Sequence, residues 1–261
     1  MLRIASWNVN SIRQRLPHLI EWLGDAAPDV VCLQEIKCLA EAFPTADIEA
    51  VGYNVAVHGQ KTFNGVAILS KYPLEDVAAG LPGDDSDEQA RYIEAVISTA
   101  EGALRVASVY LPNGNPVASE KYPYKLRWMD RLKARTAELL ALEETFVLAG
   151  DYNIIPAPED ARNPADWVSD ALFLLQSRAK FRELMALGIT DAFRACEASP
   201  GHYTFWDYQA GAWQRDNGIR IDHLLLSPQA ASRLHGCVID KSIRGREKAS
   251  DHVPVRCDLA I

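Results

Sequence analysis

The residues of this chain that could do chemistry are polar side chains that follow or begin short apolar runs. Such runs are typical of strands, and functional sites collect in the loops where several strands end at one rim of a sheet. Each polar residue alone also fits a helix cap or a surface turn. Their repeated placement at strand ends nevertheless predicts one shared site. They are Asn8, Asn10, Glu35, Tyr110, Asn113, Asp151, Asn153, Asp222, Asp251 and His252.

The carboxylates and amides of this set suit a hard divalent cation. Glu35, together with Asn8 or Asp251 and water, offers the oxygen ligands that Mg²⁺ and Mn²⁺ prefer. No histidine is needed as a ligand at such a site. We therefore expect a Mg²⁺ site around Glu35, at which Mn²⁺ can substitute.

His252 and Asp222 form a second candidate pair. A buried carboxylate can hold an imidazole in its charged form, and the imidazolium can stabilise the charge that grows on a phosphate. Asp151 is then free to orient or to deprotonate the attacking water, while Asn153 holds a phosphate oxygen or the nucleophile. Residues two apart in a strand share a face, so Asp151 and Asn153 point into one cleft if the strand continues. The set predicts metal-assisted hydrolysis of a phosphate ester.

The sequence lacks the features that characterise several other classes of protein. The chain has neither a GxSxG nucleophile motif nor a GxxxxGK[ST] phosphate loop, which argues against acyl transfer and nucleoside-triphosphate chemistry. A net charge of −8 excludes a polycation that holds nucleic acid by bulk charge. The five cysteines show no CxxC spacing, which argues against a zinc site and favours reduced thiols. Without a signal peptide or a membrane-spanning run, we expect a cytoplasmic protein.

Helical and strand patterns interleave along the chain, yet several strands lie too close together for helical crossovers. This favours mixed sheets with helices outside, a layered α/β fold, in a chain whose length allows one or two domains. A long Pro- and Asn-rich loop over 154–178 is of the kind that carries function. The predicted helices are 12–27, 124–143 and 179–188. The predicted strands are 2–9, 29–36, 55–59, 65–72, 90–99, 104–112, 145–153, 220–228 and 253–261.

Six blocks of the sequence resemble, in order, the exodeoxyribonuclease III family of DNA-repair AP endonucleases, and the resemblance runs from residue 2 to 261. It implies a single domain over 1–261, built as a four-layer α/β sandwich of two mixed β-sheets face to face, flanked by helices. It also implies a Mg²⁺-dependent enzyme that cleaves duplex DNA 5′ to abasic sites and trims 3′ ends, and that acts as a monomer away from membranes. The blocks are "WNVNSIR", "LQEIK", "YLPNG", "GDYNIIP", "RIDHLLLS" and "SDHVPV".

The resemblance also implies roles for individual residues. Glu35 becomes the principal metal ligand with help from Asn8, and Asp251 either a second ligand or the group that manages the leaving oxygen. Tyr110 contacts the scissile phosphate, as does His252 paired with Asp222. Asp151 aligns or activates water with assistance from Asn153. Lys37 lies in the same block as Glu35 and is equally well explained as a solvated lysine.

Substrate recognition is implied by two further segments, "YTFWDY" and "GIRID". A small apolar box suits a flipped-out deoxyribose that lacks its base, because a base is too large to enter. Core packing explains Phe205 and Trp206 equally well. The expected pocket residues are Asn113, Phe205, Trp206, Ile219 and Ile221. Basic residues that could contact the DNA backbone are Arg91, Lys121, Lys125, Arg162, Arg178, Arg215, Arg244 and Arg246.

Two alternatives differ from this interpretation. A relative on the same fold could act on RNA, inositol phosphates or sphingomyelin, and turnover on abasic duplex, RNA and small phosphate esters separates these. A non-catalytic DNA-binding or scaffold protein could also use the fold. Such a protein is expected to have lost some of the polar strand-end residues, whereas all of them are present here.

Overall fold

The computed structural model describes all 261 residues and contains two six-stranded mixed sheets. The first sheet has the order β11 (Leu234–Ile239), β12 (Val255–Leu259), β1 (Leu2–Asn8), β2 (Val30–Gln34), β4 (Val66–Ser70) and β3 (Asn54–His58). The second has the order β5 (Glu75–Ala79), β6 (Tyr92–Thr99), β7 (Gly102–Tyr110), β8 (Phe146–Asp151), β10 (Asp222–Leu226) and β9 (Thr190–Asp191). The β1–β2 and β7–β8 pairs are parallel, and all other pairs are antiparallel.

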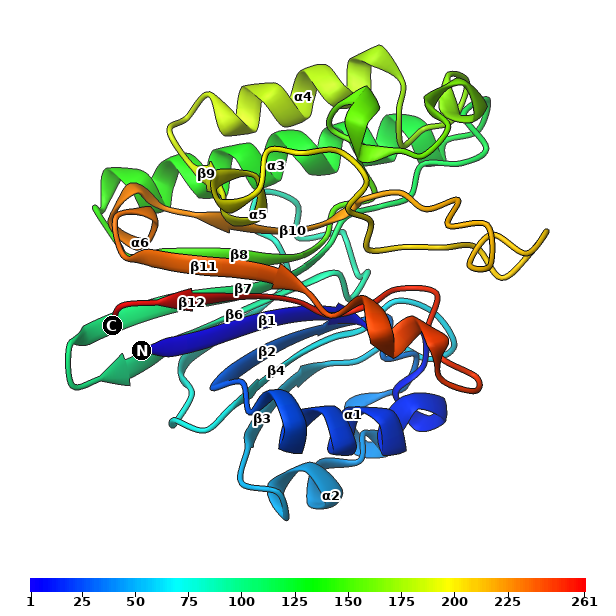
Figure 1. The fold of residues 1–261 in the computed structure, drawn as a ribbon. Helices are drawn as coiled ribbons and strands as arrows, with labels where there is room; N and C mark the ends of the chain where they lie inside the picture. The colour runs from blue at the N-terminus through cyan, green and yellow to red at the C-terminus, as the bar shows by residue number, and fades with distance from the viewer.

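Helices cover the outer face of each sheet, so the fold is the predicted four-layer sandwich (Figure 1). The outer face of the first sheet carries α1 (Ile12–Ala26) and α2 (Thr45–Glu49), and that of the second carries α3 (Lys121–Ala141) and α4 (Leu175–Met185). Two short helices, α5 (Ala192–Cys196) and α6 (Pro228–Ala231), flank β10. Single 3₁₀ turns lie at Ala40–Ala42, Pro158–Asp160, Pro164–Trp167 and Lys241–Gly245. No helix has the length and apolar character that crossing a membrane requires.

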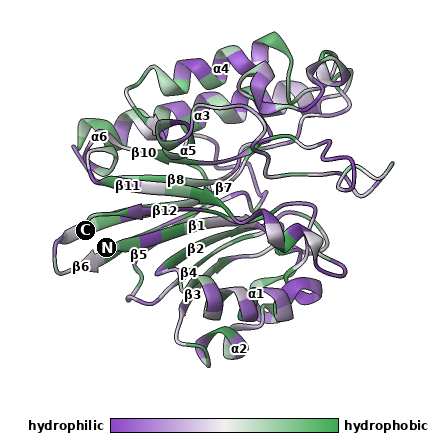
Figure 2. Ribbon diagram, in the orientation of Figure 1, coloured by the Kyte–Doolittle hydropathy of each residue, from purple (hydrophilic) through white to green (hydrophobic).

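The central strands are apolar on both faces because both faces are covered. In β1, Ile4 packs between the sheets while Trp7 packs under α1. In β8, Val147 likewise packs between the sheets, while Phe146 packs on the outer side with residues of α3. Figure 2 shows the result as hydrophobic strands in the interior and mixed colouring on the outer helices. The alternating core fixes the register of each strand, and with it the positions of the residues at the strand ends.

The end of one predicted strand beside the site differs from the sequence prediction for an identifiable reason. The strand expected over 145–153 ends at Asp151, because the Asp151 carboxylate accepts a hydrogen bond from the backbone N–H of Asn153 (2.9 Å). Asn153 has a positive φ of 47°, so it does not continue the strand. Asp151 and Asn153 therefore approach each other through a side-chain-capped turn rather than by strand alternation.

Candidate active site

The polar strand-end residues converge at one rim of the two sheets. The parallel pair β1–β2 places Asn8 beside Gln34, the residue before Glu35. In the other sheet Asp151 is the register partner of both Tyr110 and Asp222. Carboxyl ends of parallel strands lie at the same edge of a sheet. The face-to-face packing of the sheets then brings the two sets of residues together across the interface.

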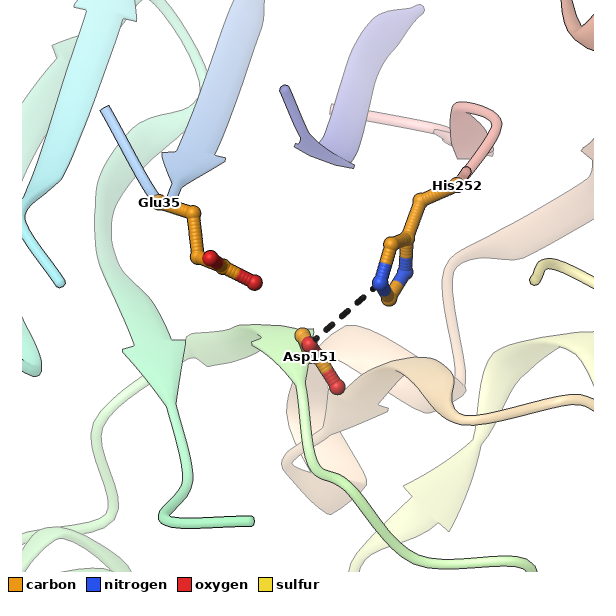
Figure 3. Close-up of side chains that lie close together, drawn as sticks. All are labelled: Glu35, Asp151 and His252. Atoms are coloured by element: carbon orange, nitrogen blue, oxygen red, sulfur yellow. Dashed lines mark ion pairs between the residues drawn. The ribbon is translucent and has the colours of Figure 1, made fainter. Parts of the chain in front are cut away.

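Glu35, Asp151 and His252 form the centre of the site (Figure 3). One potential ligand atom from each lies within 4.8 Å of the others. The side-chain nitrogen of Asn8 donates to Glu35 Oε1 and to Asp151 Oδ2, each at 2.9 Å. Its oxygen accepts from the backbone N–H of Asn10, which fixes the amide in this orientation. Asn8 thus presents a donor to the carboxylates, so in this geometry it bridges them and does not offer a ligand oxygen.

His252 is held between two carboxylates. Its Nδ1 lies 2.9 Å from Asp222 Oδ2, and its Nε2 lies 3.7 Å from Asp151 Oδ2, the contact drawn dashed in Figure 3. Burial alone lowers the pKa of an imidazole, but Asp222 and Asp151 outweigh burial and raise the pKa of His252 above its ordinary value. The side chain is therefore an imidazolium that faces the cavity as a hydrogen-bond donor.

The surroundings of Glu35, Asp151 and Tyr110 shift the pKa values of these three groups. Burial favours a raised pKa for Glu35, but the Lys37 ammonium 2.9 Å away and the Asn8 amide lower it below the ordinary value. Burial is the main cause that raises the pKa of Asp151. Burial and the nearby carboxylates raise the pKa of Tyr110 well above its ordinary value, so the phenol stays protonated. The site thus combines an ionised Glu35 with two cationic side chains and a neutral phenol.

Asp251 reaches the cluster indirectly. Its Oδ1 accepts a hydrogen bond from Asn10 Nδ2 at 2.9 Å, and the oxygen of Asn10 accepts from Lys37 Nζ. Asp251 lines the cavity but is not one of the three central residues. Lys37 is not a freely solvated lysine, because its ammonium contacts both Glu35 and Asn10.

The cavity at this rim has a volume of about 270 Å³ and contains most of the predicted residues. Phe205 and Ile221 lie in its wall together with Asn113 and Asn153, and the Phe205 ring packs edge-on against His252 with centroids 5.0 Å apart. Further lining residues that sequence reasoning did not name are Asn115, Trp167, Asp170, Leu172 and Asp207. Three of these lie in the 154–178 loop, which was expected to carry function although its individual residues were not named.

Trp206 and Ile219 are absent from this wall. Trp206 is completely buried among apolar residues, and its Nε1 donates to Asp216 at 3.0 Å. Ile219 is almost fully buried in a small cluster behind the cavity, where its backbone pairs with Phe205. Consecutive residues of an extended segment point in opposite directions, so Phe205 and Trp206 do not share the cavity. Trp206 is therefore a core residue, as the alternative interpretation of core packing predicted.

Two of the basic residues that were expected at the DNA-binding surface are buried instead. Lys125 is completely buried, and Arg244 is nearly so, with Nη2 donating to the carbonyl of Trp206. Arg91 and Lys121 instead line a separate cavity of about 380 Å³, whose wall includes Asn113 and Asn115 of the first cavity. Basic side chains thus adjoin the acidic centre on this side.

The central residues fit a hard divalent cation. Glu35 and Asp151 supply carboxylate oxygens close together, and the charged imidazole of His252 cannot be a ligand because both its nitrogens carry protons. Glu35 is ionised, and the His252 imidazolium 3.7 Å from Asp151 opposes the effect of burial on the pKa of that carboxyl. Glu35 and Asp151 would be the residues that hold such a cation.

Comparison with known proteins shows a consistent similarity over the whole chain. Residues 5–252 match the description "Endonuclease/Exonuclease/phosphatase family". Exodeoxyribonuclease III of Haemophilus influenzae is 35% identical, over 97% of this chain and 98% of that protein. An AP endonuclease structure from Archaeoglobus fulgidus superposes with a TM-score of 0.94 at 38% identity, covering all of both chains. The 3′ phosphatase NExo from Neisseria, bound to a product DNA hairpin, gives a TM-score of 0.96 at 37% identity, again over all of both chains.

Proposed function

Because the chain belongs to the endonuclease/exonuclease/phosphatase family, we propose that it is a divalent-metal-dependent DNA-repair phosphodiesterase. It cleaves duplex DNA on the 5′ side of abasic sites and also removes nucleotides and phosphates from 3′ ends. The observation that carries this proposal is the enclosed cluster of Glu35, Asp151 and His252 at the rim of the sheets. The similarity to exodeoxyribonuclease III, to an AP endonuclease and to a DNA-bound 3′ phosphatase supports DNA as the substrate.

Glu35 and Asp151 would hold the cation, for which we propose Mg²⁺, with Mn²⁺ as a substitute. When bound, the cation neutralises charge on the phosphate and on the leaving oxygen. Side chains of this protein would stabilise the phosphate and position the attacking water. The His252 imidazolium and the Tyr110 phenol donate hydrogen bonds to the phosphate oxygens as negative charge grows there. Asp151, fixed by Asn8 and the Asn153 backbone, orients the attacking water in line with the leaving oxygen or accepts its proton.

The wall of Phe205 and Ile221 supports the assignment of abasic sites. These apolar side chains lie beside His252, where the sugar attached to the reacting phosphate would sit. A deoxyribose without a base can turn into such a small space at little cost, since it has no stacking or pairing to lose.

The test is a comparison of turnover on four substrates by the same protein preparation. These are a duplex with one abasic site, the matched undamaged duplex, a single-stranded RNA and an inositol phosphate. We expect fast, Mg²⁺-dependent cleavage of the abasic duplex to a 3′-hydroxyl end, and no cleavage after chelation. A duplex with a 3′-phosphate end tests the trimming activity. Equal turnover on RNA or on the small ester would refute the proposed substrate, and activity in the presence of chelator would refute the metal.

A further inference from the structure

A buried lysine lies directly beneath the candidate active site. Lys125 projects from α3 toward the rim of the second sheet and has no exposed surface. Its Nζ donates to the backbone carbonyl of Asn113 at 3.0 Å and to that of Asn153 at 2.6 Å. These carbonyls belong to the loops that follow β7 and β8, the two parallel strands that end at the cavity. One ammonium group therefore ties two separate active-site loops together.

The side chains of the same two asparagines are joined on the cavity side. Asn113 Nδ2 donates to Asn153 Oδ1 at 3.1 Å, so the amide nitrogen of Asn153 is directed elsewhere. It donates to the carbonyl of Leu111 at 2.9 Å and approaches Asp151 Oδ2 at 3.4 Å. A continuous set of hydrogen bonds thus leads from Lys125 through the two loops to the carboxylate of Asp151.

Stability alone does not account for a lysine at this position. Enclosing an ammonium is costly, and the group here donates only two hydrogen bonds, both to neutral carbonyls. Burial accordingly lowers the pKa of Lys125 to about 7, although Asp151 and Asp170 partly oppose the effect. An apolar side chain of similar length would fill the same space without this cost. The loop is also shaped around the lysine, since a Cβ at Gly114, where φ is +90°, would lie 2.7 Å from Lys125 Cδ.

We propose that Lys125 is a positioning residue for the hydrolytic reaction. It touches neither substrate nor cation. It fixes the backbone at Asn113 and Asn153 so that the two amides meet in one arrangement and Asp151 keeps its orientation. This inference rests on the proposed hydrolysis of DNA but does not depend on a preference for abasic sites.

The first test is a double-mutant cycle between Lys125→Met and Asn153→Ala, with Lys133→Met as the matched control. Lys133 lies on the same helix but pairs with Glu183 on the outer surface. We expect Lys125→Met to lower kcat roughly 10- to 100-fold with little change in KM, the scale of loss when a catalytic group is displaced by about 1 Å. In the Asn153→Ala background the same change should cost at most a few-fold, because its effect passes through Asn153.

Two outcomes would overturn the proposal: a parental kcat in Lys125→Met, or fully multiplicative losses in the double variant. If Lys125→Met does not fold, Lys125→Gln, which still donates to one carbonyl, takes its place in the cycle.

The second test needs no DNA. Hydrogen exchange of the side-chain amides is measured by NMR for the parent, Lys125→Met and Lys133→Met. We expect faster exchange at Asn113 and Asn153 only in Lys125→Met. Unchanged exchange at both asparagines would overturn the positioning role even if the parent proved inactive on DNA, an outcome that would by itself refute only the proposed function.

Discussion

The side chains of Asp151 and His252 show how enclosure defines chemical roles. Both are nearly inaccessible, yet they lie within 3.7 Å of each other and share the cavity with Glu35. Enclosure strengthens each electrostatic interaction, because little water screens it. The same enclosure raises the pKa of Asp151, while Asp222 and Asp151 raise that of His252. In the proposed reaction, the two side chains therefore carry different protonation tendencies within one small space.

Replacement of either residue of this pair by asparagine should reduce turnover strongly. We expect Asp151→Asn and His252→Asn each to lower kcat by roughly 10²–10⁴, the range for loss of an acid–base or charge-stabilising group. Single-turnover cleavage of an abasic duplex measures the chemical step directly. Asp130→Asn, at the α3–α4 surface where Asp130 pairs with Lys180, serves as the control. Activity of either active-site variant within a few-fold of the parent would contradict its assigned role.

Glu35→Ala should change metal dependence more than folding. The Glu35 side chain is about one-fifth exposed, with a relative accessibility of 20%, and lines the cavity rather than the core. We expect a higher Mg²⁺ concentration for half-maximal activity and a thermal midpoint within a few degrees of the parent. A Mg²⁺ titration of activity and a calorimetric scan without DNA test the two parts separately. A large drop in the thermal midpoint would show that Glu35 is structural.

Residue types and order were sufficient to predict which polar side chains gather at the cavity, but not the exact wall of the cavity. Phe205 and Ile221 line the cavity as expected, whereas their neighbours Trp206 and Ile219 pack behind it. The difference depends on which way each side chain of an irregular segment points, and irregular segments have no fixed period from which this can be read. Lys125 was misplaced for a similar reason, because a buried lysine in a helix looks in sequence like any exposed one.

At the scale of elements, a buried ionic cluster connects the parts that surround the site. Arg220 donates to Asp160 in the 154–178 loop (2.8 Å) and to Asp191 at the end of β9 (2.7 Å). Burial would raise the pKa of each carboxyl, but the guanidinium outweighs it and lowers both below the ordinary value. Arg220 directly precedes Ile221 of the cavity wall, so this cluster holds that part of the wall in place.

The contribution of this cluster should disappear in acid. Both carboxyl pKa values are depressed in the folded state, so the stabilisation is complete above the ordinary aspartate pKa of about 4 and falls as pH drops through the folded-state values. We expect Arg220→Met to lower the free energy of unfolding by about 3–5 kcal/mol near neutral pH, and by less below about pH 4. Urea unfolding at several pH values measures this. A deficit that stays constant down to pH 2 would contradict the ion-pair explanation, and the surface pair Arg246–Glu21 provides a control in Arg246→Met.

Predicted elements agree with the structure where burial dictates the pattern. The central strands β1, β2 and β8 are almost entirely buried and largely apolar, and they were found within one or two residues. The strand β5 was missed because all of its residues are exposed at a sheet edge, so no alternation marks it. The strand β11 was missed as well, since its pairing with β12 contains a bulge and its residues are only partly buried. Such strands are defined by a partner distant in sequence and not by their own composition.

At the scale of the whole molecule, an acidic protein must bind an acidic polymer. The chain carries a net charge of −8, so affinity for DNA has to come from local basic residues such as Arg91 and Lys121 beside the site. Each phosphate neutralised by such a residue releases counterions, which makes binding weaker as salt increases. Local clustering of cations therefore matters more for this function than total charge.

The salt dependence of DNA binding gives a quantitative check. We expect the affinity for an abasic duplex to fall linearly on a log–log plot against salt, and Lys121→Met to reduce the slope by about 1. Fluorescence anisotropy with Ca²⁺ in place of Mg²⁺ measures binding without turnover. Lys71→Met is the control, because Lys71 follows β4 at the end of the sheet opposite Glu35. An unchanged slope in Lys121→Met would remove this lysine from the DNA interface.

The pairing of β12 with β1 has a consequence for the order of folding. Trp7 Nε1 donates to the carbonyl of His252, Ser250 donates to the carbonyl of Asn8, and β12 then runs antiparallel beside β1 in the middle of the sheet. The imidazolium is therefore brought to Asp151 only when residues 250–259 pair with β1, and contacts of such large sequence separation are slow to form during folding. A chain in which residues 255–259 are detached from β1 would leave one side of that strand unpaired and His252 without its anchor. Activity at this site would thus report that the first sheet is completely assembled.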